Sequence, residues 1–328
     1  MNARKILLAV IAVVFVYAAF IFYNDVAKLR AALSHFAWWT FAAALGLALG
    51  NYFLRFLKWQ YYLARLDVRG VPWVESLTIY LAGFALSVTP AKAGEVFKSA
   101  LLLSARGVPV ARTAPIVVAD RLTDLISLIL IAVFGSFWFE GGRLPAIAAS
   151  VMVAALLAFI FFPPLGEAVL GVAERFPGGR ALAPKARQAY AALRVLAGPA
   201  ALVVPTALSL VAWGLECVAL WVVCVGLDHA VSVAVGFFTY SVATIAGAVM
   251  MLPGGVGGTE ATMEALLLQL SHPRMPQGTA AAATLVVRFA TLWFAVIVGA
   301  LALAAFRRLY DRNTPEHDER DDRLPPLP

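Results

Sequence analysis

The sequence predicts an all-α protein that crosses a membrane several times. Of its 328 residues, 62% are hydrophobic and only 14% are charged, and the mean hydropathy is +0.84. A soluble domain of this length carries far more charge, so these values indicate a polytopic membrane protein. A second observation is internal: a Pro/Gly break followed by a carboxylate occurs at 90–95 and again at 253–260. Broken segments in corresponding places of two halves predict a substrate site between repeats.

Long apolar stretches predict six full transmembrane helices, because about 20 apolar residues cross the hydrocarbon core of a bilayer. The expected spans are 6–23, 40–63, 113–138, 145–162, 200–226 and 280–306. The first span resembles a signal peptide. No small-residue cleavage site follows it, so we expect it to remain as an anchor.

Two pairs of shorter apolar segments predict re-entrant helical hairpins. The pairs are 74–89 with 94–105, and 231–250 with 258–270. Basic residues gather in cytoplasmic loops. The basic loops of this chain fall on one side only if each pair enters and leaves the bilayer on the same face. We therefore expect both termini to lie in the cytoplasm and the two hairpins to open to opposite faces. We expect the protein to reside in the cell inner membrane.

The two halves also align outside the breaks. Residues 54–67 align without a gap with 215–228, and Tyr80 in the first hairpin has a counterpart near Tyr240. An alternative is the general likeness of Ala/Leu-rich membrane segments. Matching polar landmarks favour a repeat of span, hairpin and span. Because the hairpins open to opposite faces, we expect these repeats to be inverted.

These expectations divide the chain into a membrane domain and a tail. The membrane domain covers 1–310, with repeats at about 40–138 and 200–306. A cytoplasmic linker at 163–199 joins them, and an amphipathic helix around 184–197 is expected to lie on the membrane surface. The tail 311–328 is charged and Pro-rich, which predicts a disordered cytoplasmic segment.

Ionisable residues inside the spans identify candidate site residues, because burying a charge at membrane depth costs at least ~2.5 kcal/mol on insertion scales. Asp120 and Asp124 share a helix face beside Arg121. They form either a structural salt-bridge patch or a pair that orients Arg121 in a cavity. Arg55 lies toward the cytoplasmic end of its span and is expected to recruit an anionic head group. For Lys58 we expect snorkelling to the interface.

Arg288 is the only charged residue between 275 and 306 in the sequence, so it requires a partner on another helix or an anionic ligand. Glu216, alone within its span, is the natural protein partner. Glu260 and Glu264, one turn apart in the second hairpin, are further candidates.

The two breaks predict anion sites. A helix that begins after a break directs unpaired N–H groups and its positive dipole end into the membrane. Lys92 and Lys98 add charge to the first break, and the glycines of the second allow close backbone approach. Glu95 and Glu260 either cap their helices or accept a proton or an ammonium group.

Other classes of site have no pattern in this sequence. It contains no metal-ligand cluster, nucleotide-binding loop or nucleophile–base pair, so we expect no cofactor and no enzymatic activity. The formal charge of +7 is the kind expected for cytoplasmic loops in contact with anionic lipids. We therefore expect membrane lipids, and no nucleic acid, as partners.

These landmarks together resemble the family named for the transmembrane region of lysylphosphatidylglycerol synthetase. The matching residues are Pro90-x-x-x-Gly94-Glu95 with Lys98, Asp120-Arg121-x-x-Asp124, Pro253-Gly254-Gly255-x-Gly257-x-x-Glu260, and Arg288. The resemblance covers about 6–306. Lys92 stands where the family usually has arginine, which keeps the charge but loses the bidentate fork.

The resemblance implies a flippase-like membrane domain. In its best-known members this domain precedes a soluble aminoacyl-transferase domain and is thought to flip the aminoacylated lipid. The present sequence stops about twenty residues after the last span, so aminoacyl transfer is not implied. Stand-alone relatives accompany glycolipid, isoprenoid or hopanoid genes, which leaves the substrate open.

Our first functional hypothesis is a lipid transporter that moves an anionic or zwitterionic head group through a cavity between inverted repeats. A membrane-embedded enzyme acting on lipid phosphates, and a non-catalytic accessory subunit that binds lipid-synthesis enzymes, are the alternatives. The residues expected to bind the substrate are Arg55, Lys92, Gly94, Glu95, Lys98, Arg121, Asp124, Glu216, Gly254, Gly255, Gly257, Glu260 and Arg288.

Overall fold

The computed structural model describes residues 26–88, 94–137, 162–175, 198–250 and 253–311, with a few isolated positions between 147 and 196. Every regular element in these ranges is helical, so the expected all-α class is confirmed for the described part of the chain. The span expected at 6–23, the tail beyond 311 and most of 145–162 lie outside the described residues.

Three of the described helical segments are long and apolar enough to cross a membrane. They are α3 (Trp38–Arg65), α10 (Pro199–Gly226) and a continuous helix near the C-terminus. The last consists of α13 (Gln277–Arg288), the π-helical turn η4 (Phe289–Trp293) and α14 (Phe294–Asp311). These segments confirm the spans expected at 40–63, 200–226 and 280–306.

A further helix, α6 (Val110–Ser136), covers the span expected at 113–138. Its 27 residues correspond to about 40 Å of helix, which is sufficient to cross a bilayer. It differs from the three candidate spans because it carries Arg112, Asp120, Arg121 and Asp124. Most of its buried residues line its second half, where it packs between other helices.

The expected hairpin arms are helices with boundaries close to the predicted ones. The first pair is α4 (Trp73–Ala82), continued by the 3₁₀ turn η1 (Gly83–Leu86), and α5 (Gly94–Arg106). The second pair is α11 (Val233–Val249), the turn η3 (Pro253–Gly255) and α12 (Gly258–Leu270).

Two helices were not expected from the sequence. They are the short α2 (Val26–Ser34), which packs on α13, and α8 (Pro163–Ala173), which lies within the predicted linker. Arg187 forms ion pairs with Glu167 of α8 and with Glu174, which directly follows this helix, so Arg187 lies against α8 and its end.

Corresponding elements of the two halves have matching lengths and turns. Helices α3 and α10 each have 28 residues, and α5 and α12 each have 13. After α3 the chain turns through Asp67 with φ 53°, and after α10 through Asp228 with φ 54°. The next N–H in each turn bonds back to the helix: Val68 N to the Leu63 carbonyl at 2.9 Å, and His229 N to the Cys224 carbonyl at 3.1 Å.

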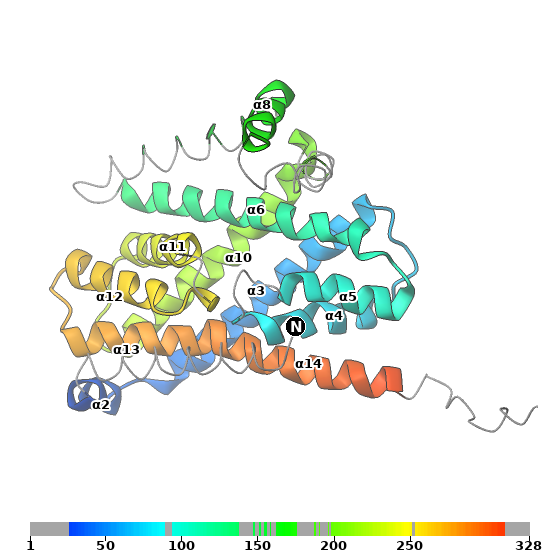
Figure 1. The fold of residues 1–328 in the computed structure, drawn as a ribbon. Coiled ribbons are helices and arrows are strands. Elements are labelled where there is room, and N and C mark those ends of the chain that lie inside the picture. The colour runs from blue at the N-terminus through cyan, green and yellow to red at the C-terminus, as the bar shows by residue number, and fades with distance from the viewer. Residues whose placement is uncertain are drawn as a thin grey trace, which may run out of the picture.

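Helices α3 and α10 run antiparallel at the centre of the molecule (Figure 1). At one end, Ala37 N donates to the Gly226 carbonyl at 2.8 Å; at the other, the Tyr61 hydroxyl donates to the Ala201 carbonyl at 3.2 Å. The surrounding packing is reciprocal, since α11 packs on α6 of the first half while α4 and η1 pack on α14 of the second.

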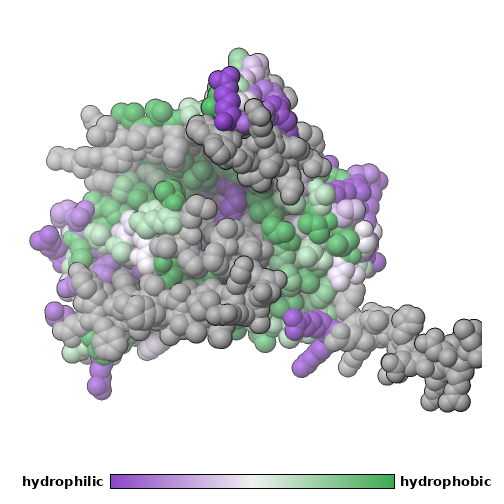
Figure 2. All heavy atoms as spheres, in the orientation of Figure 1, coloured by the Kyte–Doolittle hydropathy of each residue, from purple (hydrophilic) through white to green (hydrophobic). Residues whose placement is uncertain are grey.

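The exterior is rich in exposed apolar side chains, as a membrane protein requires. Large residues such as Phe53, Phe134 and Leu301 are more than half exposed. Figure 2 shows hydrophobic residues over much of one face, with a hydrophilic area recessed near its middle. Several charged residues of the helices are buried inside the molecule, among them Lys58, Asp124, Glu260 and Arg288.

Candidate functional site

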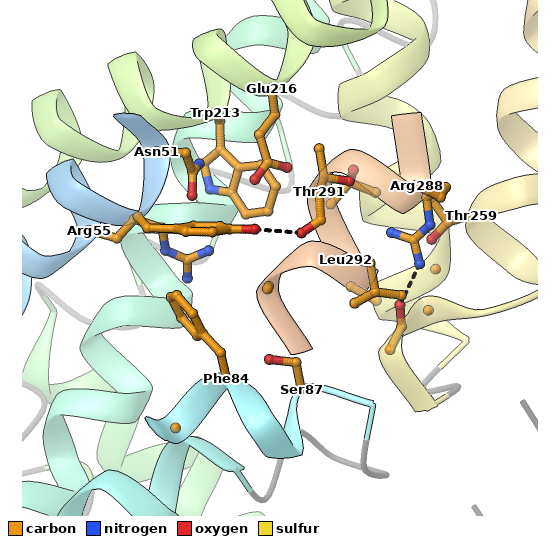
Figure 3. Close-up of a pocket in the computed structure, with 18 of the residues that line it drawn as sticks. Asn51, Arg55, Phe84, Ser87, Trp213, Glu216, Thr259, Arg288, Thr291 and Leu292 are labelled. Carbon is orange, nitrogen blue, oxygen red and sulfur yellow. Dashed lines mark hydrogen bonds between the residues drawn. The ribbon is translucent and has the colours of Figure 1, made fainter. Parts of the chain in front are cut away.

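A cavity of about 310 Å³ lies between α3, α10 and the helices around them. Its walls come from both halves: α3, the first hairpin and α6 on one side, and α10, the second hairpin, α13 and α14 on the other. Arg55 and Arg288 reach the cavity from opposite sides, and Glu216 points into it from α10 (Figure 3).

The charged residues in the described wall are mainly cations. Arg55, Lys98, Arg121 and Arg288 line the cavity, and Glu216 is the one carboxylate among the described lining residues. Lys98 is 6% exposed, and its ammonium lies 4.7 Å from the centre of the Tyr80 ring and 5.4 Å from that of Trp59. Such cation–π contacts hold a buried cation without neutralising its charge.

Behind the cavity, a buried ion cluster joins α3, α6 and α10. The Lys58 ammonium is fully buried and lies 2.6 Å from a carboxylate oxygen of both Asp120 and Asp124. It also donates to Ser209 Oγ of α10 at 2.6 Å. The Arg55 guanidinium lies 2.7 Å from the second oxygen of Asp124 and therefore enters the cavity from this cluster.

One expectation for these residues requires correction. Lys58 does not snorkel to the interface, because two carboxylates and a hydroxyl bind its ammonium inside the protein. Asp120 and Asp124 form ion pairs, as in the salt-bridge alternative, and their paired cations come from α3.

The second arginine of the cavity is held by the second hairpin. Arg288 Nε lies 2.6 Å from Glu260 Oε1, and its guanidinium donates to the Gly254 carbonyl at 2.8 Å. The other Glu260 oxygen accepts the Gly257 N–H at 2.6 Å. Glu260 thus acts as a cap for α12 and as the partner of Arg288, while Glu216, the expected partner, accepts a hydrogen bond from the Tyr240 hydroxyl instead.

The tip of the second hairpin requires glycine at several positions. Gly254, Gly255 and Gly257 have φ values of 62°, 70° and 91°, in the left-handed region that L residues with a side chain rarely adopt. Gly254 and Gly255 line the cavity, and α12 begins immediately after the tip. The break expected from the sequence at 253–258 is confirmed, and it brings backbone to the cavity wall.

Three buried polar atoms of wall residues have no hydrogen-bond partner, and one of them is Arg55 Nε. Asn51 donates from its Nδ2 to the Ala212 carbonyl at 2.8 Å, but its buried Oδ1 is unsatisfied. The buried indole Nε1 of Trp213 is also unsatisfied. Buried polar atoms without partners are uncommon, so an acceptor and a donor here favour a polar ligand in the cavity.

Comparison with protein-family models gives one match. The model described as the lysylphosphatidylglycerol synthase TM region aligns with residues 6–299, which is most of the chain. The chain belongs to this family. A search of curated proteins found no match. Membership and the apolar helices together establish a multi-pass membrane protein.

Most of the described residues that the sequence predicted to bind the substrate lie in one region of the fold. Arg55, Lys98, Arg121, Glu216, Gly254, Gly255 and Arg288 line the cavity, while Asp124 and Glu260 pair with its arginines and Gly257 binds Glu260. Gly94 is the first residue of α5, and Glu95 follows it there. Lys92 lies outside the described residues.

Several wall residues of this family member were not identified from the sequence. Asn51, Tyr52 and Trp213 face the cavity, and the Tyr52 hydroxyl donates to the Thr291 carbonyl at 2.8 Å. Asn51 could have been identified, because it is a polar residue inside an apolar span. Aromatic residues in a membrane helix carry no comparable signal, because most of them face lipid or the core.

The tip geometry of this family member predicts a selective effect of Gly255→Ala. A Cβ there meets Thr259 Oγ1 at 2.7 Å, and the φ of 70° costs roughly 1–2 kcal/mol for a residue with a side chain. We expect the midpoint of thermal unfolding in detergent to fall in Gly255→Ala. Gly46→Ala is the matched control, because a Cβ at this helical site meets nothing within 4 Å. Equal losses in both variants contradict the prediction.

Proposed function

We propose that this protein is a lipid transporter of the inner membrane that moves an anionic or zwitterionic head group through the cavity while the acyl chains remain in the bilayer. The observation that carries the proposal is the charge of the wall: four cations and one carboxylate among the described lining residues of a cavity inside an apolar protein. Such charges are costly at membrane depth unless they serve a ligand or a pathway.

The ion pairs around the cavity support binding of a phosphate group. Arg55 and Arg288 are each oriented by a carboxylate, at 2.7 Å from Asp124 and 2.6 Å from Glu260. An oriented guanidinium presents its remaining N–H groups in a fixed fork that matches phosphate geometry. Lys98 and Arg121 are two further cations in the wall.

An inverted repeat is the architecture that we propose for this transport. Arg55 and Glu216 each lie ten residues before the last residue of α3 and α10, and Arg121 and Arg288 each lie eleven residues after the first residue of α6 and α13. The antiparallel packing of α3 on α10 supports a two-fold axis in the membrane plane. The cavity then lies on this axis, where alternating access is expected.

We also propose six full spans, two re-entrant hairpins that open to opposite faces, and cytoplasmic termini. Under this topology the turn after α3 is cytoplasmic and the loop between α12 and α13 lies on the other side. Arg69→Cys and Arg274→Cys test it, because both side chains are exposed. A membrane-impermeant maleimide added to intact cells should label only the Arg274→Cys variant. Labelling of both from one side contradicts the inverted topology.

Translocation by the purified protein is the direct test of transport. Vesicles of phosphatidylcholine with a fluorescent phosphatidylglycerol are compared with protein-free vesicles, and the outer-leaflet probe is quenched chemically. We expect exchange between leaflets only with protein, and a strong reduction in Arg121→Gln but not in Arg69→Gln at the surface. Intact recovered lipid separates transport from an enzyme on lipid phosphates, and absence of exchange favours an accessory subunit.

A further inference from the structure

The carboxylates around the cavity fall into two kinds. Asp120 and Asp124 pair with Arg55 and Lys58, and Glu260 pairs with Arg288. Glu216 differs, because the partner that the described structure gives it is the neutral hydroxyl of Tyr240. It is 7% exposed and lines the cavity with Asn51 and Trp213, whose unsatisfied polar atoms lie in the same wall (Figure 3).

Glu216 lies far along α10 from both ends of the helix. It lies about 15 Å from the C-terminal end of α10 and about 26 Å from its first residue. An ionised carboxylate at such depth is costly unless a cation pairs with it, whereas the neutral acid with a hydrogen-bond partner is cheaper. Glu216 therefore has the surroundings of a group that gains and loses a proton.

The groups around Glu216 come from every element packed against it. They are Arg55 and Tyr52 of α3, Asp124 of α6, Tyr240 of α11, Arg288 of α13, and Cys217 beside it on α10. Both arginines are already engaged by other carboxylates. A bound phosphate adds negative charge to the same cavity and repels an ionised Glu216. Protonation of Glu216 removes this repulsion, so proton and anion bind cooperatively and by the same factor in each direction.

We propose that Glu216 is the proton-binding residue that couples lipid movement to a transmembrane proton gradient. This inference rests on the proposed transport function. A proton from water on one side adds to the Glu216 carboxylate as the head group enters, and it leaves to water on the other side with the head group. One proton accompanies one singly charged phosphodiester, so the transported pair is electrically neutral. A pH gradient drives the movement, and a membrane potential does not.

The experiment uses the full-length protein in phosphatidylcholine vesicles with fluorescent phosphatidylglycerol and a gradient of one pH unit. For the wild type we expect about a tenfold accumulation of probe in the leaflet facing the more alkaline solution, since the gradient supplies about 1.4 kcal/mol per proton. Protein-free vesicles correct for spontaneous redistribution. A potassium–valinomycin potential at equal pH should leave the probe evenly distributed.

Variants assign this coupling to Glu216. Glu216→Gln should abolish both the accumulation and the proton uptake that a pH-sensitive dye records when short-chain phosphatidylglycerol binds. Glu216→Asp, which keeps an ionisable group, should retain both in reduced form and guards against loss through misfolding. Glu264→Gln makes the same change at a buried carboxylate outside the cavity wall and should behave as the wild type.

Each other result overturns the inference. An even probe distribution under the pH gradient, accumulation driven by potential, or proton uptake that persists in Glu216→Gln excludes Glu216 as the coupling residue while transport stands. If Glu216→Gln loses transport of phosphatidylethanolamine only, Glu216 binds the ammonium group of that lipid instead of coupling protons. If the wild type moves no lipid at all, the proposed transport function itself is wrong.

Discussion

Replacing Arg288 with alanine is expected to destabilise the protein by roughly 3–5 kcal/mol and to abolish lipid translocation. Arg288 and Glu260 are 7% and 2% exposed, and the alanine leaves the Glu260 carboxylate buried without its cation. The Gly254 carbonyl loses its donor as well, so the hairpin tip loses a cross-link to α13. Thermal unfolding in detergent measures the first effect and proteoliposome exchange the second.

A double variant separates the two effects. Arg288→Met with Glu260→Gln removes both charges, and the glutamine keeps an oxygen that can accept the Gly257 N–H. We expect most of the stability to return, since exchanging a buried pair for neutral residues is often tolerated. Translocation should remain absent. Arg288→Lys should restore transport only partly, because lysine lacks the planar fork. Recovered transport in the double variant contradicts a role of Arg288 with the substrate.

Lys58→Met is expected to have an effect on stability of similar size. The Lys58 ammonium is fully buried and binds Asp120, Asp124 and Ser209, so its removal leaves two carboxylates with Arg55 as their remaining α3 cation. We expect a loss of roughly 3–5 kcal/mol in unfolding free energy. Three helices lose their common contact, so Arg55 should also lose its orientation and translocation should fall.

Arg65→Met is the matched control on the same helix. Arg65 is exposed and donates to the Tyr61 hydroxyl one turn away. Such surface contacts contribute about 0–1 kcal/mol, so this variant should unfold near the wild type. Comparable destabilisation by both changes is inconsistent with a structural role specific to the Lys58 cluster.

The helical elements of this chain could be predicted to a large extent from hydropathy and from Pro/Gly breaks. The arm expected at 258–270 has these bounds as α12, because the glycine tip and Ser271 mark its ends in sequence. Helix α2 was missed since its nine residues have little apolar character of their own and depend on packing against α13. Helix α8 was missed inside a segment that its prolines suggested was a loop.

The charged residues of the cavity could be predicted as a set, but each ion pair could be narrowed only to a few candidates. Arg55, Arg121 and Arg288 could be predicted as site residues because a charge inside an apolar membrane helix is costly and usually serves a function. Which carboxylate meets which cation depends on helix rotation and depth. Of the three candidate partners, Glu260 pairs with Arg288, while Glu216, the first candidate, bonds to Tyr240. Sequence spacing predicts which residues are neighbours on one helix, but it does not predict which residues of another helix they contact.

The antiparallel pairing of α3 and α10 has a consequence for synthesis of the protein. Asn51 bonds to the Ala212 carbonyl, and Lys58 to Ser209, across 161 and 151 residues of chain. At 5–20 residues per second, the ribosome reaches Ala212 roughly 8–32 s after Asn51. During this interval the nascent first half lies in the membrane with polar groups that have no partner on α10. Chains that stop before α10 keep Asn51 without its partner at Ala212, whereas Lys58 retains Asp120 and Asp124 of α6.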